Sequence, residues 1–348
     1  MTRRFALLLI FPCAGVLWAR PQTDVVVMIN GDRFTCEIKK LERGVLYASF
    51  DYVDGTVSIQ WAKVARVESR QLFLVHTEDG SVYEGTLRTP ETSAQQPVKI
   101  EVLESPQKTE TLERQQVVQI AQTAQSFWRR LSGNIDSGWM YAKGNDTTQY
   151  NFGANVYLNR ELWSGEANLA STLSKSAGVT ASTHNQAQLK ALRRFGADQW
   201  FYSGAAQFLQ SSQQGINVQT TLGGSIGKFL ADTNTARIAV SGGLAWQRTQ
   251  YETSTDVRNP PDALAALLVA DLHLFRFKKT SLDVSASLLP VLSEPGRLRS
   301  YVNTSYSIQI ITNLWWKISF YGNWDNRPPA TFSGSDYGTS GSLSWSFN

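Results

Sequence analysis

The chain has 348 residues, of which 42% are apolar and 18% are charged, and its formal net charge is +4. This composition is too hydrophilic for a bundle of membrane-spanning helices, each of which needs about 20 consecutive apolar residues. The basic residues are scattered or occur in pairs such as Arg193-Arg194. We therefore expect no nucleic-acid partner, because that function requires a basic cluster on one face.

The first residues have the pattern of a secretory signal peptide. Two arginines precede an apolar run from Phe5 to Leu17, which is followed by small residues and Ala19. A basic segment, a short apolar segment and a small residue at the cleavage position are typical of such signals. We therefore expect residues 1–19 to be removed on export. Cys36 is then the one cysteine left, which excludes an intrachain disulfide.

Residues 20–125 predict a small β module. Asn30-Gly31 and Asp79-Gly80 each separate two short apolar runs, and these dipeptides favour two-residue hairpins because both positions accept positive φ. Similar runs recur with a period of about fifty residues. The pattern therefore predicts two repeated units, at about 24–68 and 72–122, each like an SH3- or Sm-type barrel.

Modules of this kind often bind peptides or form oligomers. We therefore expect that residues 20–125 contact a periplasmic protein or the cell wall. Trp61 is a candidate ligand platform, although an aromatic residue at such a position is more often part of a core or an interface. Residues 126–131 form the predicted linker to the next domain.

From Ser132 onward, longer runs alternate between apolar and polar residues, as in strands whose side chains point to opposite faces. We interpret 132–348 as an antiparallel transmembrane β-barrel of about twelve strands, an even number that places both ends in the periplasm. The stretch from Asp262 to Leu274 is rich in Ala and Leu and fits a helix equally well; we assign a strand because omitting it leaves an odd count. The predicted strands are 132–142, 147–159, 164–176, 182–194, 200–211, 216–230, 236–250, 262–277, 280–291, 298–311, 314–325 and 336–348.

Aromatic residues mark the ends of the predicted strands. Trp316 and Trp324 are eight residues apart, or about 26 Å at roughly 3.3 Å per residue. At a tilt of roughly 40° this strand spans about 20 Å, close to the apolar band of roughly 25 Å between the aromatic girdles of outer-membrane barrels. We expect these girdles to contact outer-membrane lipid. The predicted girdle residues are Trp163, Trp200, Trp315, Trp316, Trp324, Trp345 and Phe347.

Residues of the opposite parity should face the barrel interior. Twelve strands about 4.8 Å apart and tilted by roughly 40° give a backbone radius of roughly 12 Å. Side chains then leave either a narrow aqueous passage or a filled interior. The pattern thus favours a narrow small-solute channel or a passive barrel whose polar interior is held by salt bridges, and both remain open. The charged residues assigned to the interior are Asp136, Glu166, Lys190, Asp283 and Lys317.

Candidate catalytic residues are few. His184 neighbours Ser182 and Thr183, and His273 follows Asp271 on the same face. Because barrels are rich in Ser and Thr, and a triad is recognised by geometry rather than by spacing, chance proximity is the favoured interpretation. We expect no enzyme, with a hydrolase at the barrel rim as a minor alternative. The absence of Cys/His clusters and Asp ladders predicts no metal and no cofactor.

Several stretches carry a resemblance to a known family. These are the Gly-rich run from Leu131 to Gly138, the Gly144-Asn145 turn, the run from Gly223 to Gly227 and the alternating Ser and aromatic residues near the end. Over roughly residues 131–348 the chain resembles the salt-induced outer-membrane proteins grouped as domain of unknown function 481.

The resemblance implies an outer-membrane barrel of a Gram-negative-type bacterium, inserted by the barrel-assembly machinery. It implies no established activity, substrate or catalytic residue, and it does not extend to the N-terminal module. With both barrel ends on the inner side, the module should lie in the periplasm. A structural link between the outer membrane and a periplasmic partner or the cell wall is therefore an alternative to a channel.

Overall fold

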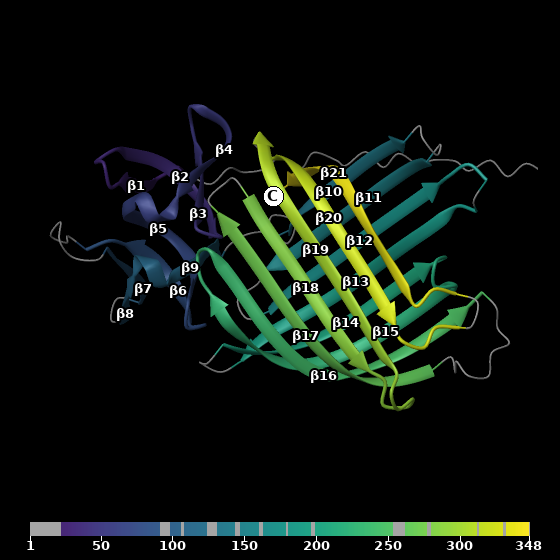
Figure 1. Ribbon diagram of the computed structural model, residues 1–348. Helices are drawn as coiled ribbons and strands as arrows, with labels where there is room; N and C mark the ends of the chain where they lie inside the picture. Colours follow the sequence, from purple (N-terminus) through teal and green to yellow (C-terminus); the bar gives the residue numbers. More distant parts are fainter. Residues whose placement is uncertain are drawn as a thin grey trace, which may run out of the picture.

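The computed structural model describes two all-β bodies, a large barrel and a smaller module at one of its ends (Figure 1). The predicted signal peptide and most of the predicted linker lie outside the described residues. Within the described ranges, no helix combines the length and the apolar character needed to cross a membrane. The described residues are 22–90, 98–105, 108–123, 131–142, 147–159, 163–178, 180–195, 199–252, 262–276, 280–311, 313–329 and 332–347.

Twelve antiparallel strands form the closed barrel, which confirms the predicted fold class and strand number. Each strand pairs with its neighbours in the sequence, and the first and last strands close the ring through pairs such as Gly133 with Phe347. The strands are β10 (Leu131–Ala142), β11 (Thr147–Asn159), β12 (Trp163–Lys175), β13 (Ser182–Phe195), β14 (Trp200–Ser211), β15 (Ile216–Asp232), β16 (Ala236–Tyr251), β17 (Asp262–Arg276), β18 (Thr280–Pro290), β19 (Leu298–Ile311), β20 (Leu314–Asp325) and β21 (Ser335–Phe347).

The stretch that also fitted a helix is a strand. β17 pairs with β16 along most of its length and with β18 from Leu268 to Arg276. Its residues alternate accordingly: Ala263 and Ala265 are buried, whereas Leu264 is 45% exposed. Pairing on both sides satisfies the backbone groups of this segment, so ring closure overrides the helical preference of its Ala and Leu residues.

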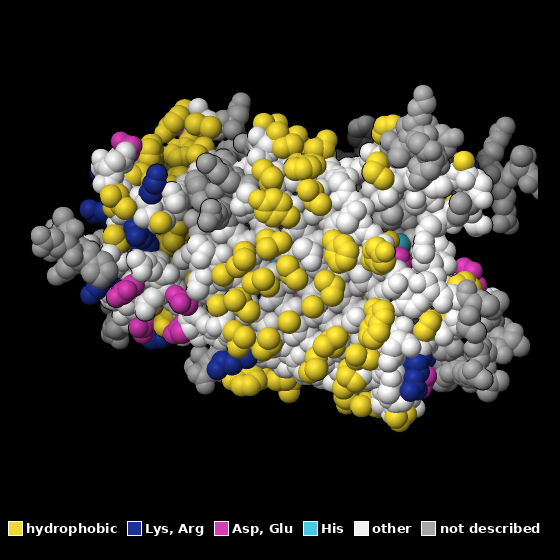
Figure 2. All heavy atoms as spheres, viewed as in Figure 1, with side chains coloured by type: hydrophobic (Ala, Val, Ile, Leu, Met, Phe, Trp, Pro, Cys, Tyr) yellow, Lys and Arg dark blue, Asp and Glu magenta, His cyan; other side chains and the backbone are white. Residues whose placement is uncertain are grey.

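The barrel exterior is apolar. Outward-facing Leu189, Leu244 and Ile226 are 58%, 56% and 58% exposed, respectively, and hydrophobic side chains are spread over the visible face of the barrel (Figure 2). Soluble monomers rarely expose apolar patches larger than a few hundred Å². A belt of this kind is typical of a barrel surrounded by lipid.

Eight of the nine module strands form a continuous series in the order β4-β3-β2-β1-β5-β6-β7-β8, and β9 pairs with β2 and β5. A single hydrophobic core extends from Val26 through Phe73 to Ile120. The strands are β1 (Asp24–Met28), β2 (Arg33–Glu42), β3 (Val45–Phe50), β4 (Val53–Gln60), β5 (Val64–Thr77), β6 (Val82–Arg88), β7 (Lys99–Ser105), β8 (Lys108–Glu113) and β9 (Val117–Gln122), with the 3₁₀ turns η1 (Trp61–Lys63) and η2 (Arg114–Gln116).

The strand order of the two halves is similar. In the first half β1–β4 and η1 precede the closing strand β5, and in the second half β5–β8 and η2 precede the closing strand β9. The predicted boundary between the units falls inside β5, so the halves share a strand and a core and form one body. Trp61 is 2% exposed and donates its Nε1–H to the carbonyl oxygen of Arg114 at 2.9 Å, which makes it a core residue. Cys36 is also fully buried.

The module lies at the end of the barrel that carries the short connections and both termini of the barrel domain (Figure 1). Asn234, between β15 and β16, donates to the carbonyl oxygen of Val117 at 3.0 Å, and Gln199 donates to the carbonyl oxygen of Glu78. Gly44 has a φ of +70°, and a Cβ there would lie 2.8 Å from the carbonyl oxygen of Asn234. Only glycine accepts both the turn and this close approach.

Candidate functional site

The five predicted interior charges lie on the strand face opposite the lipid belt; three of them form ion pairs and a fourth contacts a histidine. Lys317 contacts Asp136 at 2.6 Å, Lys190 contacts Asp271 at 2.9 Å, and Asp283 contacts the imidazole of His273 at 2.8 Å. The fifth charge, Glu166, accepts a hydrogen bond from the Asn168 amide at 2.9 Å. The interior is therefore a network of polar contacts.

The pair between Lys190 and Asp271 joins β13 to β17, four strands away in the ring. In a circular barrel with a radius of roughly 12 Å, strands four apart lie about 21 Å from each other. An extended lysine and an aspartate joined by one hydrogen bond span at most about 13 Å. The two walls are therefore closer than in a circular barrel, and the ion pair crosses the lumen.

A second crossing lies toward the opposite end of the barrel. The Nδ1 atom of His184 on β13 lies 2.8 Å from Asp336 on β21, and the His184 ring stacks on Tyr321 of β20 at 4.0 Å. Ser211 donates its hydroxyl to the same Asp336 carboxylate at 2.6 Å. A nucleophilic triad requires a hydrogen bond between the serine and the histidine, whereas here both residues bond to the aspartate. The arrangement is a polar layer across the lumen.

A third network lies at this same end. The Arg297 side chain is fully buried and contacts Asp325 at 2.7 Å and Glu294 at 2.9 Å. Arg299 shares Asp325 at 3.0 Å and also donates to Gln247. Gln247 in turn bonds to Tyr301, at 3.1 Å. Together these side chains link β16, β19 and β20 on the inner face of the barrel.

At the end that faces the module, two arginines share one carboxylate. Arg194 of β13 contacts Asp232 at 2.6 Å and Arg237 of β16 contacts it at 2.8 Å. The Arg194 guanidinium also lies 4.4 Å from the centre of the Phe229 ring, and the Arg237 guanidinium lies 5.9 Å from it. The aromatic ring and the carboxylate hold both cations at the mouth of the barrel.

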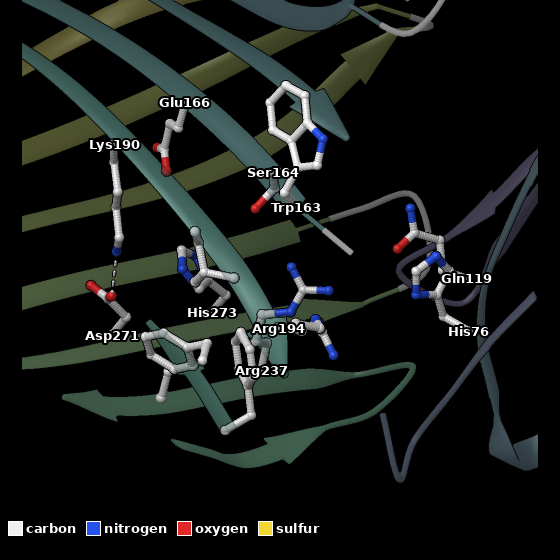
Figure 3. A pocket seen from close by; sticks show the side chains of 14 residues that line it. His76, Gln119, Trp163, Ser164, Glu166, Lys190, Arg194, Arg237, Asp271 and His273 are labelled. Atoms are coloured by element: carbon white, nitrogen blue, oxygen red, sulfur yellow. Dashed lines mark hydrogen bonds and ion pairs between the residues drawn. The ribbon is translucent and has the colours of Figure 1, made fainter. Parts of the chain in front are cut away.

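A cavity of about 130 Å³ lies between these arginines and the module (Figure 3). His76 of β5 and Gln119 of β9 form its module side, and the remaining lining residues come from β12 to β17. The barrel side is lined by Trp163, Ser164, Glu166, Lys190, Leu192, Arg194, Phe201, Phe229, Arg237, Ala239, Asp271 and His273.

Electrostatics couple the module to the barrel mouth. Burial lowers the pKa of His76 to about 4, and the guanidinium groups of Arg194 and Arg237 act in the same direction against the opposing charge of Asp232. His76 is therefore neutral at pH 7. Its environment combines groups of the module with charged groups of the barrel.

Arg43 reaches the same mouth from the turn between β2 and β3. Its guanidinium lies 5.7 Å from the centre of the Phe275 ring of β17. Desolvation lowers the pKa of Arg43, but the carboxylates of Glu42 and of Asp283 on β18 outweigh it, and the net shift is upward. A module cation thus lies in the field of an interior carboxylate of the barrel.

Most predicted girdle residues are exposed on the outer surface. The exposed fraction of these side chains ranges from 37% at Phe347 to 53% at Trp345. Trp315 differs, because it shares its strand face with Lys317 and is only partly exposed. The exposed predicted girdle residues are Trp163, Trp200, Trp316, Trp324, Trp345 and Phe347.

Sequence reasoning missed the module residues His76, Gln119 and Arg43, because no local pattern indicates which loops meet the barrel. It also missed Arg194 and Arg237, although their parity places both on the interior face. In the part of the chain that the structure describes, no group of three or more His, Cys, Asp or Glu side chains is arranged to hold a metal ion.

Solved barrels with a similar architecture include the NanC porin (11% identity, TM-score 0.37, covering 62% of this chain and 97% of that one). The KdgM porin matches at 12% identity and a TM-score of 0.33, covering 62% and 99%. The translocator domain of the autotransporter NalP from Neisseria meningitidis matches at 14% identity and a TM-score of 0.31, covering 63% and 86%. At these identities and TM-scores no function passes from those barrels to this chain.

Comparison with curated proteins finds no match. The sequence profile of one family, described as a protein of unknown function, DUF481, matches residues 135–347. This range covers nearly the whole barrel and more than half of the chain, and it agrees with the resemblance drawn from the sequence. The chain belongs to the DUF481 family.

Proposed function

We propose that the chain is an outer-membrane protein whose barrel is a narrow solute passage, closed in this structure, with the N-terminal module seated over its periplasmic mouth. The observation that carries the proposal is the ion pair between Lys190 and Asp271, directly above a mouth that the module covers. Glu166 forms no ion pair among the described residues, and a carboxylate at this depth favours a water-filled path over a purely structural core, because an unpaired charge is costly in apolar surroundings.

The orientation rests on the connections. The module contacts the end of the barrel where residues 233–235 and the other short links lie, and outer-membrane barrels have short turns on the periplasmic side. Export through the predicted signal at residues 1–19 and insertion by the barrel-assembly machinery complete this route. The exposed apolar belt then contacts outer-membrane lipid.

The polar contacts that cross the lumen also favour a second function, a structural link. β4 and β8 lie at the two ends of the strand series of the module, and edge strands offer unpaired backbone groups to an added strand. A periplasmic protein or a cell-wall component bound there would be tied to the outer membrane through the barrel. This candidate predicts no conductance under any condition.

A reversible cross-link separates the two functions. Glu78 and Gln199 meet across the junction, so the double variant Glu78→Cys/Gln199→Cys can be joined by a short, reducible thiol cross-linker. Native Cys36 does not compete, because burial and the neighbouring carboxylates raise its thiol pKa to about 12. In planar bilayers we expect the reduced protein to show brief openings and the cross-linked protein to show none.

The control is the same pair of measurements on Glu78→Cys alone, for which the reagent should change nothing. Absence of conductance from heat-modifiable, reduced protein over a range of salt concentrations would reject the passage and leave the structural link. Cellular location is tested with Ile29→Cys, since Ile29 is 64% exposed. An impermeant maleimide should label it only after the outer membrane is permeabilised, and labelling in intact cells would reverse the topology.

A further inference from the structure

The cavity between the module and the barrel contains two opposite local charge imbalances. On one side, Glu166 accepts a hydrogen bond from the neutral Asn168 amide, and no cation lies within ion-pair distance among the described residues. On the other side, Arg194 and Arg237 share the single carboxylate of Asp232. One negative and one positive charge are therefore left without a partner around the same space.

The two arginines retain hydrogen-bonding capacity toward the cavity. A guanidinium carries five N–H donors, and the contacts to Asp232 use Nη2 of Arg194 and Nε of Arg237. Their other donors have no protein acceptor among the residues that the structure describes. Figure 3 shows both guanidinium groups in the space between the barrel wall and His76 and Gln119 of the module.

The surrounding groups do not cancel either imbalance. Lys190 lies opposite Glu166 in the β12–β13 pair, but its ammonium group contacts Asp271 at 2.9 Å, on the barrel side of the cavity, and forms no ion pair with Glu166. His273 is engaged with Asp283 at 2.8 Å. His76 is 6% exposed and neutral, so it adds no charge at the module side.

The volume limits the size of a ligand. The cavity measures about 130 Å³, and a protein cavity of roughly 150 Å³ holds one benzene-sized molecule. A ligand of about six non-hydrogen atoms therefore fits this space. Alanine has that size and carries one carboxylate and one ammonium group.

We propose that this cavity binds a small zwitterion, whose carboxylate accepts hydrogen bonds from Arg194 and Arg237 and whose ammonium group lies against Glu166. A bound simple anion would leave the negative charge of Glu166 without a cationic partner. A bound simple cation would leave the two arginines sharing the single carboxylate of Asp232. A zwitterion supplies an anionic partner for the arginines and a cationic partner for Glu166 in one molecule. If the barrel is a passage, this site indicates the class of solute that it carries, and to that extent the inference rests on the proposed function. Binding of the zwitterion itself requires no conduction.

The test is calorimetric titration of the purified, full-length protein in detergent with three probes: alanine, acetate and methylammonium. We expect alanine to bind more tightly than either singly charged probe. Glu166→Gln should weaken alanine binding about tenfold and leave acetate binding unchanged, whereas Arg237→Gln should weaken both about tenfold, the size of one charge-assisted contact. Arg193→Gln and Arg248→Gln, on the outer faces of the same two strands, should match the wild type.

Two results would overturn the proposal. Acetate binding as tight as alanine binding, together with no effect of Glu166→Gln on alanine, would make this an anion site. No heat from any probe would remove the site altogether. Heat-modifiable migration on gels verifies the folding of each variant. If Arg237→Gln does not fold, the difference between alanine binding and acetate binding in Glu166→Gln still tests the proposal. Because the titration does not involve conductance, binding without conductance would reject the passage alone.

Discussion

Lys190 on β13 and Asp271 on β17 form an ion pair of 2.9 Å between strands that lie four places apart in the ring. The contact requires the two walls of the barrel to approach each other, and it occupies the lumen just above the mouth cavity. His184 and Asp336 repeat the relationship toward the other end of the barrel, at 2.8 Å. The interior is thus braced at two levels by side chains from facing walls.

The brace should appear as coupling between its two residues. Lys190→Gln and Asp271→Asn should each destabilise the barrel by about 1–3 kcal/mol, because each leaves a partly buried charge without a partner. The double variant should lose less than the sum, with a coupling of about 0.5–3 kcal/mol. Urea unfolding followed by gel mobility measures these free energies, and Arg193→Gln should stay within about 0.5 kcal/mol of the wild type. Strict additivity would mean that the pair contributes no mutual stabilisation.

The lipid belt predicts a depth-dependent cost of charge on β20. Phe320 lies midway between Trp316 and Trp324 on the outer face and is 39% exposed, whereas Trp324 is 44% exposed at the rim. Phe320→Arg should cost about 2–4 kcal/mol and Trp324→Arg about 0–1 kcal/mol, since the penalty falls from midplane to interface. Folding yields in lipid vesicles report the difference. Equal yields would contradict the placement of this strand in the membrane.

Docking of the module should depend on one glycine. Gly44→Ala places a Cβ against the Asn234 carbonyl at 2.8 Å, whereas Gly31→Ala places one in open space, and both residues have positive φ. Both variants should lose roughly 1 kcal/mol of module stability from backbone strain. Gly44→Ala alone should also slow the cross-linking of Glu78→Cys to Gln199→Cys. Equal cross-linking rates in the two variants would show that this contact does not hold the module.

Acid should weaken the module through His76. The folded pKa of His76, about 4, is below its ordinary value of 6.5. Between these values the unfolded chain binds a proton that the folded chain does not, so stability falls as the pH drops from about 6.5 to about 4 and is unaffected above that range. The loss is roughly 3 kcal/mol. Urea unfolding of the module should show a flatter pH profile for His76→Gln, and parallel profiles would contradict the burial of a neutral histidine.

Much of the barrel was predictable because lipid and water impose opposite demands on alternate residues. The predicted strands at 147–159 and 314–325 coincide with β11 and β20. In such strands the lipid-facing and interior-facing residues alternate along the sequence, so the pattern can be recognised without the structure. Parity also separates Trp315 from Trp316, although both were assigned to the girdle. The segment of β17 was ambiguous because Ala and Leu also favour helices, and only its pairing decides.

The contacts between side chains of the candidate site could not be predicted from the alternation of apolar and polar residues. Parity assigns Lys190 to the interior but does not select Asp271 as its partner, because the partner lies on a distant strand of a flattened ring. The meeting of His76 with Arg194 depends on how two folded bodies dock, and no local pattern in the module indicates it. Contacts between distant strands are set by tertiary packing. The periodicity of a single strand carries no information about which distant residues meet.

The central claim is that the module is seated on the mouth of the barrel, and cross-linking in the native membrane tests it most directly. Glu78→Cys/Gln199→Cys should cross-link nearly completely in outer membranes and retain heat-modifiable migration, because Gln199 donates a hydrogen bond to the Glu78 backbone. Glu78→Cys/Gln213→Cys is the control, since Gln213 follows β14 at the opposite end of the barrel, and it should not cross-link. Equal yields for the two pairs, or none for the first, would contradict the seated module and the closed mouth.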